Sequence, residues 1–180
     1  LERAAWILAK LGELYPEAHC ELEFEGPFQL AVATVLSAQC TDKRVNLVTP
    51  ALFRRFPDPA SLAVASTAEV EELVRSTGFF RNKTKSLIGL ARGLVERFGG
   101  EVPRTMDELL TLPGVARKTA NCVLSNAFGL AEGVVVDTHV LRLSKLLGLT
   151  RAKAPARVEE DLCRRFPPGS WAILSHRLIW

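Results

Sequence analysis

Apolar side chains recur along this chain at helical rather than strand spacing. The first stripe, at positions 4, 7, 8, 11 and 14, ends near Pro16, and a later stripe ends at Gly99-Gly100. Pro and Gly punctuate the chain often enough to keep each helix short. Only Val134-Val135-Val136 is typical of a strand. The pattern predicts an all-α fold of nine or ten short helices rather than a long up-down bundle.

Polar residues at the expected helix starts refine this outline. Residues 27–38 are predicted to form a buried helix, with Asp42 capping the next helix and Pro50 kinking it. Ser66 and Thr105 each stand three residues before a glutamate, which is the spacing of a capping box. Further helices are expected from Asn82 to Gly99, over 116–128, over 137–147, from 155 onward and from about 170 to the end.

Composition places the chain among ordinary globular proteins. It has 180 residues, of which 48% are hydrophobic and 24% charged, and this mixture excludes disordered and fibrous classes. The longest apolar runs fall far short of the ~20 residues that a membrane helix needs. The four cysteines fit no metal-knuckle spacing, so we expect free thiols in a reducing cytosol and no metal bound by this chain. They are Cys20, Cys40, Cys122 and Cys163.

Charge is unevenly distributed, although the net charge is only +3. Residues 75–97 contain six basic side chains and one acidic side chain, and residues 142–165 contain seven basic and three acidic ones. Two basic stretches on a near-neutral body either form one positive face for a polyanion or are simply solvated helix faces. Charge alone does not decide between these interpretations.

The most informative segment runs from Glu108 to Leu124. It predicts a helix, a tight apolar hairpin around Pro113-Gly114 and a second helix. A helix start leaves N–H groups without intrahelical acceptors and carries the positive end of the dipole, which suits a phosphate. Such a contact recognises the nucleic-acid backbone rather than its sequence. The alternative is a plain corner between two helices.

Lys118 falls in the first turn of that second helix, where a cation is unfavourable. The dipole, together with partial burial, would lower the pKa of the ammonium and free the amine as a nucleophile. An amine nucleophile forms Schiff bases with carbonyl-like carbons. The alternative is a surface lysine that binds phosphate.

Asp137 follows the three valines at the expected start of a helix. A capping carboxylate is held rigidly and kept ionised by the N–H groups whose hydrogen bonds it accepts. Asp137 is therefore either a simple cap or, if the two helix starts face each other, a carboxylate partner of the Lys118 amine.

The segments Leu112-Pro-Gly-Val-Ala-Arg-Lys-Thr-Ala-Asn121 and Val136-Asp-Thr-His139 resemble the helix-hairpin-helix DNA glycosylase superfamily, most closely its endonuclease III branch. The resemblance extends to residues 36–42, 77–80 and 176–179 and covers the chain from about residue 3 onward. The combination of hairpin and aspartate is highly specific. Lys118 favours this branch, because adenine-excising and mismatch-thymine relatives typically lack the lysine.

The resemblance implies a bifunctional glycosylase and abasic-site lyase of base excision repair that removes oxidised pyrimidines. Such an enzyme bends duplex DNA and extrudes the damaged base into a pocket between two helical lobes. By analogy, Lys118 would attack C1′ and expel the base, while Asp137 would help to deprotonate the amine and stabilise positive charge on the sugar. The Schiff base would then permit β-elimination and a nick 3′ to the lesion.

The resemblance also implies which residues contact DNA. Gln39 would fill the space left by the extruded base, and Phe79 would act as an apolar wedge unless it packs in the core. Arg81 and Lys83 would hold flanking phosphates. Ser37 and His139 are pocket candidates, although a structural role suits His139 equally well. The hairpin contacts are assigned to Pro113, Gly114, Val115, Ala116, Arg117 and Thr119.

Two departures from the family pattern stand out. Ala116 occupies a hairpin position that commonly holds a second glycine, and if that position needs positive φ the alanine costs about 1 kcal/mol. The family also usually continues into a four-cysteine iron–sulfur loop, whereas this sequence ends at Trp180. A 4Fe-4S cluster is therefore expected only if the native chain continues past Trp180.

We therefore expect two helical lobes with a central cleft. Residues 21–130 would form a six-helix barrel that carries the hairpin, and residues 1–20 would join 131–180 in the second lobe. The expected partner is double-stranded DNA with a damaged base or an abasic site. Membrane association is not expected, and the protein is predicted to be a monomer.

No basic-then-apolar leader opens the chain, so we expect a cytoplasmic, nucleoid-associated protein. Three alternatives remain open: a glycosylase for a purine or mismatch, a non-catalytic helix-hairpin-helix DNA-binding module, and a helical scaffold for protein partners.

Overall fold

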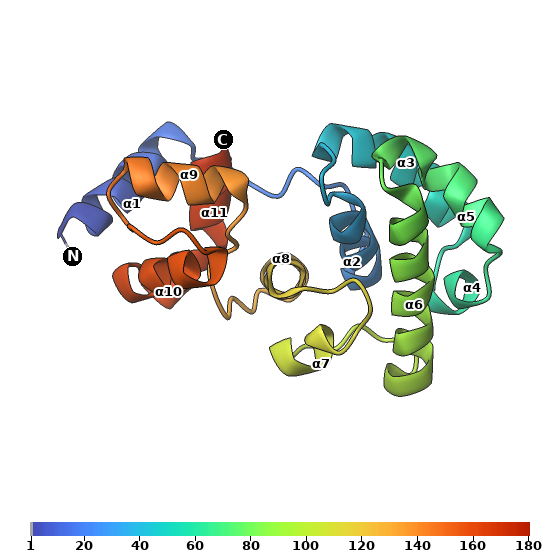
Figure 1. The fold of residues 1–180 in the computed structure, drawn as a ribbon. Coiled ribbons are helices and arrows are strands. Elements are labelled where there is room, and N and C mark those ends of the chain that lie inside the picture. The colour runs from blue at the N-terminus through green and yellow to red at the C-terminus, as the bar shows by residue number, and fades with distance from the viewer. Residues whose placement is uncertain (1) are drawn as a thin grey trace. The chain divides into compact units, whose positions relative to one another are not determined.

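The computed structural model describes residues 2–180, and its regular structure in that range is entirely helical, as expected (Figure 1). None of these helices is long and apolar enough to cross a membrane. The helices are α1 (Glu2–Leu14), α2 (Pro27–Leu36), α3 (Asp42–Arg55), α4 (Pro59–Ala63), α5 (Thr67–Val74), α6 (Phe80–Phe98), α7 (Met106–Leu110), α8 (Arg117–Phe128), α9 (Thr138–Leu146), α10 (Pro155–Arg165) and α11 (Trp171–Ile179), with short 3₁₀ turns η1 (Arg75–Thr77) and η2 (Pro168–Ser170).

The chain divides into two compact units. Unit 2 is the continuous segment Glu21–Val123, and unit 1 combines the two ends of the chain, up to Cys20 and from Leu124 onward. The sequence predicts the second boundary after residue 130, whereas the structure places it inside α8. The last turns of this helix make their contacts in unit 1, where His176 Nε2 donates a 2.8 Å hydrogen bond to Asn126 Oδ1.

Unit 2 is organised around α6, its longest helix. Helices α4 and α5 pack on α6, and α2 packs on it as well (Figure 1). The inward face of α6 follows the expected period, because Leu87, Leu90 and Leu94 are all at most 1% exposed. Burial of one such leucine stabilises the fold by about 1.5–3 kcal/mol. Residues 30–36 of α2 are all buried, which confirms the predicted buried helix.

Unit 1 has its own apolar core, to which both ends of the chain contribute. Ile7 of α1 joins Val140 of α9, Leu162 of α10 and Leu174 of α11 in this cluster. The valine triplet at 134–136 contributes two buried side chains to it without forming a strand, because no second strand in the described chain pairs with it.

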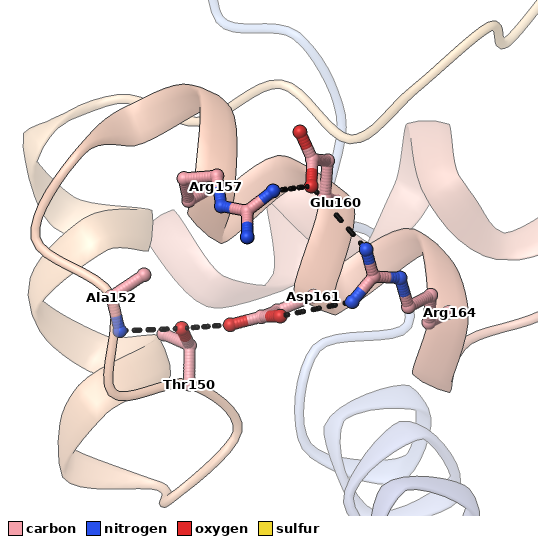
Figure 2. Close-up of polar contacts among 6 residues, drawn as sticks. All are labelled: Thr150, Ala152, Arg157, Glu160, Asp161 and Arg164. Atoms are coloured by element: carbon pink, nitrogen blue, oxygen red, sulfur yellow. Dashed lines mark hydrogen bonds and ion pairs between the residues drawn. The ribbon is translucent and has the colours of Figure 1, made fainter.

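Helix α10 is tied to the turn before it by a hydroxyl that both donates and accepts. Thr150 Oγ1 donates a 2.6 Å hydrogen bond to Asp161 Oδ2 and accepts one of 3.0 Å from Ala152 N (Figure 2). This contact fixes the loop between α9 and α10.

Several helix starts differ from the sequence expectation. Thr41 rather than Asp42 caps α3, and its Oγ1 accepts from Arg44 N. Pro50 lies inside α3 without ending it. The Ser66 side chain makes no cap bond.

Candidate functional site

The hairpin between α7 and α8 sits directly on α6. Gly114 has φ +77°, and a Cβ at this position would lie 2.7 Å from Ser86 Cβ of α6. Gly89 and Gly93 continue the same face of α6, where a Cβ at Gly89 would lie 3.0 Å from the Pro113 ring. The small residues of α6 therefore permit a close approach of the hairpin backbone, and this approach sets where α8 begins.

Ala116 does not carry the strain considered in the sequence. Among the described residues, positive φ outside glycine occurs only at Gln39 and Phe79, so the alanine costs no left-handed backbone strain. Its methyl group is exposed, as are Pro113 and Arg117, whereas Val115 and Thr119 are buried. The hairpin thus presents part of its backbone outward and anchors itself by Val115.

Lys118 is the second residue of α8 and its side chain is exposed. The bond from Ala120 N to Ala116 O is 2.9 Å long, so Lys118 lies in the turn whose N–H groups have no intrahelical acceptor. The exposure differs from the partial burial expected from the sequence. An exposed amine at a helix start is accessible to a substrate.

Asp137 is the N-cap of α9, as expected. Its Oδ1 accepts a 2.7 Å hydrogen bond from Val140 N, and the backbone is extended with φ −95°. Asp137 is half-buried and directly follows the buried Val136. Its second oxygen, Oδ2, accepts no hydrogen bond from the described chain, so it remains available to another partner. Asp137 belongs to unit 1 and Lys118 to unit 2.

Gln39 and Phe79 occupy two exposed turns of unit 2. Gln39 follows α2 with φ +52°, and Phe79 precedes α6 with φ +47°. The Phe79 ring is 64% exposed, so it does not pack in the core. This left-handed turn also explains why α6 begins at Phe80 rather than being capped by Asn82.

The remaining pocket candidates lie at helix ends. Ser37 follows α2, is half-buried and donates from Oγ to Thr34 O at 2.9 Å. His139 is exposed in the first turn of α9, two residues beyond Asp137.

The two side chains predicted to hold flanking phosphates differ in their exposure to solvent. Arg81 is exposed and stacks over the Phe80 ring, with 5.1 Å between the guanidinium carbon and the ring centroid. Lys83 is only 5% exposed, and its Nζ donates a 2.6 Å hydrogen bond to Thr77 O. The structure therefore does not leave Lys83 available to a phosphate, because its ammonium points into the protein.

The two basic stretches belong to different units, residues 75–97 to unit 2 and residues 142–165 to unit 1. In the second stretch, Glu160 Oε2 pairs with Arg157 at 2.6 Å and with Arg164 at 3.3 Å (Figure 2). The Glu160 carboxylate therefore neutralises part of the positive charge that the sequence suggested for α10.

None of the four cysteines forms a disulfide bond. Within residues 2–180, no three His, Cys, Asp or Glu side chains gather closely enough to hold a metal ion. The described residues therefore do not supply the ligands of an iron–sulfur cluster.

Comparison with known proteins decides the family. The model of the "HhH-GPD superfamily base excision DNA repair protein" family matches residues 32–168. The chain belongs to this superfamily. Endonuclease III of Synechocystis sp. is 58% identical over 179 residues, which cover 99% of this chain and 82% of that protein. Endonuclease III of Bacillus subtilis is 45% identical over 181 residues, covering 100% and 82%.

A solved structure extends the similarity to three dimensions. The trapped Endonuclease III–DNA covalent intermediate superposes with a TM-score of 0.95 at 44% identity, covering 99% of this chain and 84% of that chain. Together with the two relatives, it places the chain in the endonuclease III branch of the HhH-GPD superfamily.

Two features of this HhH-GPD site were not predicted from the sequence. The stripe of Ser86, Gly89 and Gly93 on α6 receives the hairpin, and glycines inside an otherwise strong helix were the available signal. The burial of Lys83 left no such signal, because an inward lysine and an exposed one look alike in a basic segment.

Proposed function

We propose that this protein is a bifunctional DNA glycosylase and abasic-site lyase that removes oxidised pyrimidines from duplex DNA and nicks the strand by β-elimination. The observation that carries the proposal is Lys118, an exposed amine at the start of α8 directly after the hairpin docked on α6. A trapped enzyme–DNA covalent intermediate, as described for the 44% identical Endonuclease III, is what an amine nucleophile is expected to form.

The chemistry uses two side chains. The neutral Lys118 amine attacks C1′ of the damaged nucleotide, the bond from C1′ to the base breaks, and the base leaves with the electron pair and takes up a proton. The Asp137 carboxylate accepts the proton that Lys118 must lose and stabilises positive charge on the sugar. Opening of the sugar ring leaves a Schiff base between Nζ and C1′.

The Schiff base makes the 2′ hydrogen acidic. Water takes up this hydrogen as a proton, a double bond forms between C2′ and C3′, and the bond from C3′ to the phosphate oxygen breaks. The phosphate leaves as the 5′ end of the downstream strand. Hydrolysis of the imine returns the lysine amine and releases the unsaturated sugar end.

Binding to the duplex is assigned to the hairpin and the two strained turns. The exposed hairpin backbone and the start of α8 suit a phosphate. The exposed Phe79 ring suits an apolar wedge, and the Gln39 amide can hydrogen-bond to the base left without a partner. We assign the protein to the cytoplasm, on the nucleoid, where this substrate lies.

The test compares Lys118→Gln and Lys118→Arg with the wild-type protein on a duplex carrying one thymine glycol. Both variants should lose borohydride trapping and nicking, because neither side chain forms a Schiff base, while Lys118→Arg keeps the positive charge for binding. Lys10→Gln removes an exposed lysine from α1 and should trap normally. Trapping by Lys118→Gln would remove the lysine from this role, and duplex binding by a wild-type protein that never traps would favour the non-catalytic module.

A further inference from the structure

The two strained turns of unit 2 need a physical support. Among the described residues, Gln39 and Phe79 are the two non-glycine positions with positive φ. Each such conformation costs on the order of 1–3 kcal/mol and persists only where its surroundings enforce it. Both side chains are exposed, so their own packing does not enforce it.

The Lys83 side chain holds the carbonyl at the start of the Phe79 turn. Its Nζ donates a 2.6 Å hydrogen bond to Thr77 O, while its backbone N–H makes the ordinary helical bond of 3.1 Å to Phe79 O. Thr77 itself is buried, and its Oγ1 donates to Val74 O at 2.8 Å. The turn through Gly78 and Phe79 is thus anchored at its first and last carbonyls.

The Lys83 side chain bridges two packed elements. The 3₁₀ turn η1, which ends at Thr77, packs against both α3 and α6, and Lys83 belongs to α6. Burial lowers the pKa of Lys83. The bond from Nζ to Thr77 O therefore connects η1 to α6 across the Phe79 turn.

The energetic cost of this lysine favours a role beyond packing. A buried ammonium loses its hydration, which costs several kcal/mol unless other groups compensate. The hydrogen-bond acceptor of the Lys83 ammonium is a carbonyl rather than a carboxylate. A methionine of similar volume would fill the same space without that penalty.

We propose that Lys83 is a positioning residue that holds the Phe79 turn in its left-handed conformation, so that the ring is presented to the duplex in a fixed orientation. This inference rests on the proposed function. An abasic nucleotide has no base to unstack, so its extrusion places little demand on the wedge. Loss of Lys83 therefore slows base excision much more than nicking at an existing abasic site.

The kinetic test measures Lys83→Met. The control is Arg54→Met on α3, which also replaces one positive charge with methionine but at an exposed position. Single-turnover excision of thymine glycol should fall by at least about tenfold in Lys83→Met, because small misplacements of positioning groups have effects of this size. Borohydride trapping on a duplex with a preformed abasic site should stay within about threefold of wild type. Arg54→Met should leave both rates unchanged.

A background without the Phe79 ring separates positioning from general structural damage. In Phe79→Ala, excision is already slow, and adding Lys83→Met should lower it by no more than about twofold, since coupled residues do not add. A further large loss in that background would show that Lys83 acts otherwise than through the Phe79 side chain and would overturn the proposal.

Hydrogen exchange of the free protein gives a readout that does not depend on activity. In Lys83→Met, amides of residues 75–80 should exchange faster, with those of residues 37–41, of α4 and of the middle of α6 unchanged. No change at residues 75–80 overturns the proposal. If Lys83→Met does not fold, Lys83→Arg replaces it, and excision that falls in parallel with trapping overturns the proposal. A wild-type protein that neither excises nor traps refutes the proposed function instead, while hydrogen exchange at residues 75–80 still tests whether Lys83 holds the Phe79 turn.

Discussion

Asp137 shows how one carboxylate can serve both the fold and the chemistry. Its Oδ1 caps α9 through Val140 N, and its Oδ2 accepts no hydrogen bond from the described chain. The cap keeps the carboxylate in one rotamer, so the proposed base is oriented by the same bond that starts the helix.

Substitutions at Asp137 can separate these two roles. Asn is as good an N-cap as Asp, so Asp137→Asn should change the free energy of unfolding by less than about 0.5 kcal/mol, whereas Asp137→Ala should cost about 1 kcal/mol. Both should slow base excision by several orders of magnitude, because neither accepts a proton. Urea unfolding and single-turnover excision measure the two effects, and normal excision by Asp137→Asn would leave the residue a cap alone.

At the scale of elements, the position of the hairpin depends on the small side chains of α6. Ser86, Gly89 and Gly93 let the backbone around Gly114 approach α6 closely, and α8 starts from that contact. The phosphate-binding site proposed at the start of α8 thus depends on the packing of the hairpin against α6, and not on the hairpin sequence alone.

A pair of glycine substitutions isolates this contact. Gly129 has φ +67° with nothing within 4 Å of a Cβ, so Gly129→Ala should cost only the backbone strain, about 1–2 kcal/mol. Gly114→Ala adds a Cβ 2.7 Å from that of Ser86, and this overpacking should cost about 1–3 kcal/mol more. Chemical unfolding measures both, and equal losses would contradict the close docking.

At the scale of the whole molecule, α8 is the element that both units share. Its first residues, including Lys118, belong to unit 2, and its last residues belong to unit 1. The hydrogen bond from His176 to Asn126 joins α11 to the latter part. Burial lowers the pKa of His176, and the nearby His19 acts in the same direction.

This shift predicts a pH dependence of stability. Because the folded pKa lies below the unfolded value of about 6.5, the unfolded chain binds more protons as the pH falls through that value, and the fold is destabilised. The melting temperature should therefore drop between about pH 7 and pH 5, and the drop should be smaller in His176→Gln. Thermal unfolding with the exposed His139→Gln as control tests this; equal drops in wild type and His176→Gln would refute it.

The sequence by itself determined the helices, the hairpin, the Asp137 cap and the family, because local periodicity, turn residues and short motifs are properties of neighbouring positions. Only the tertiary structure decided the state of Ala116, the burial of Lys83 and the exposure of Phe79. Backbone φ at a hairpin and the direction of a long side chain depend on what packs against them. Those neighbours, such as Ser86 for Gly114 and Thr77 for Lys83, are chosen by the folded chain rather than by the local sequence.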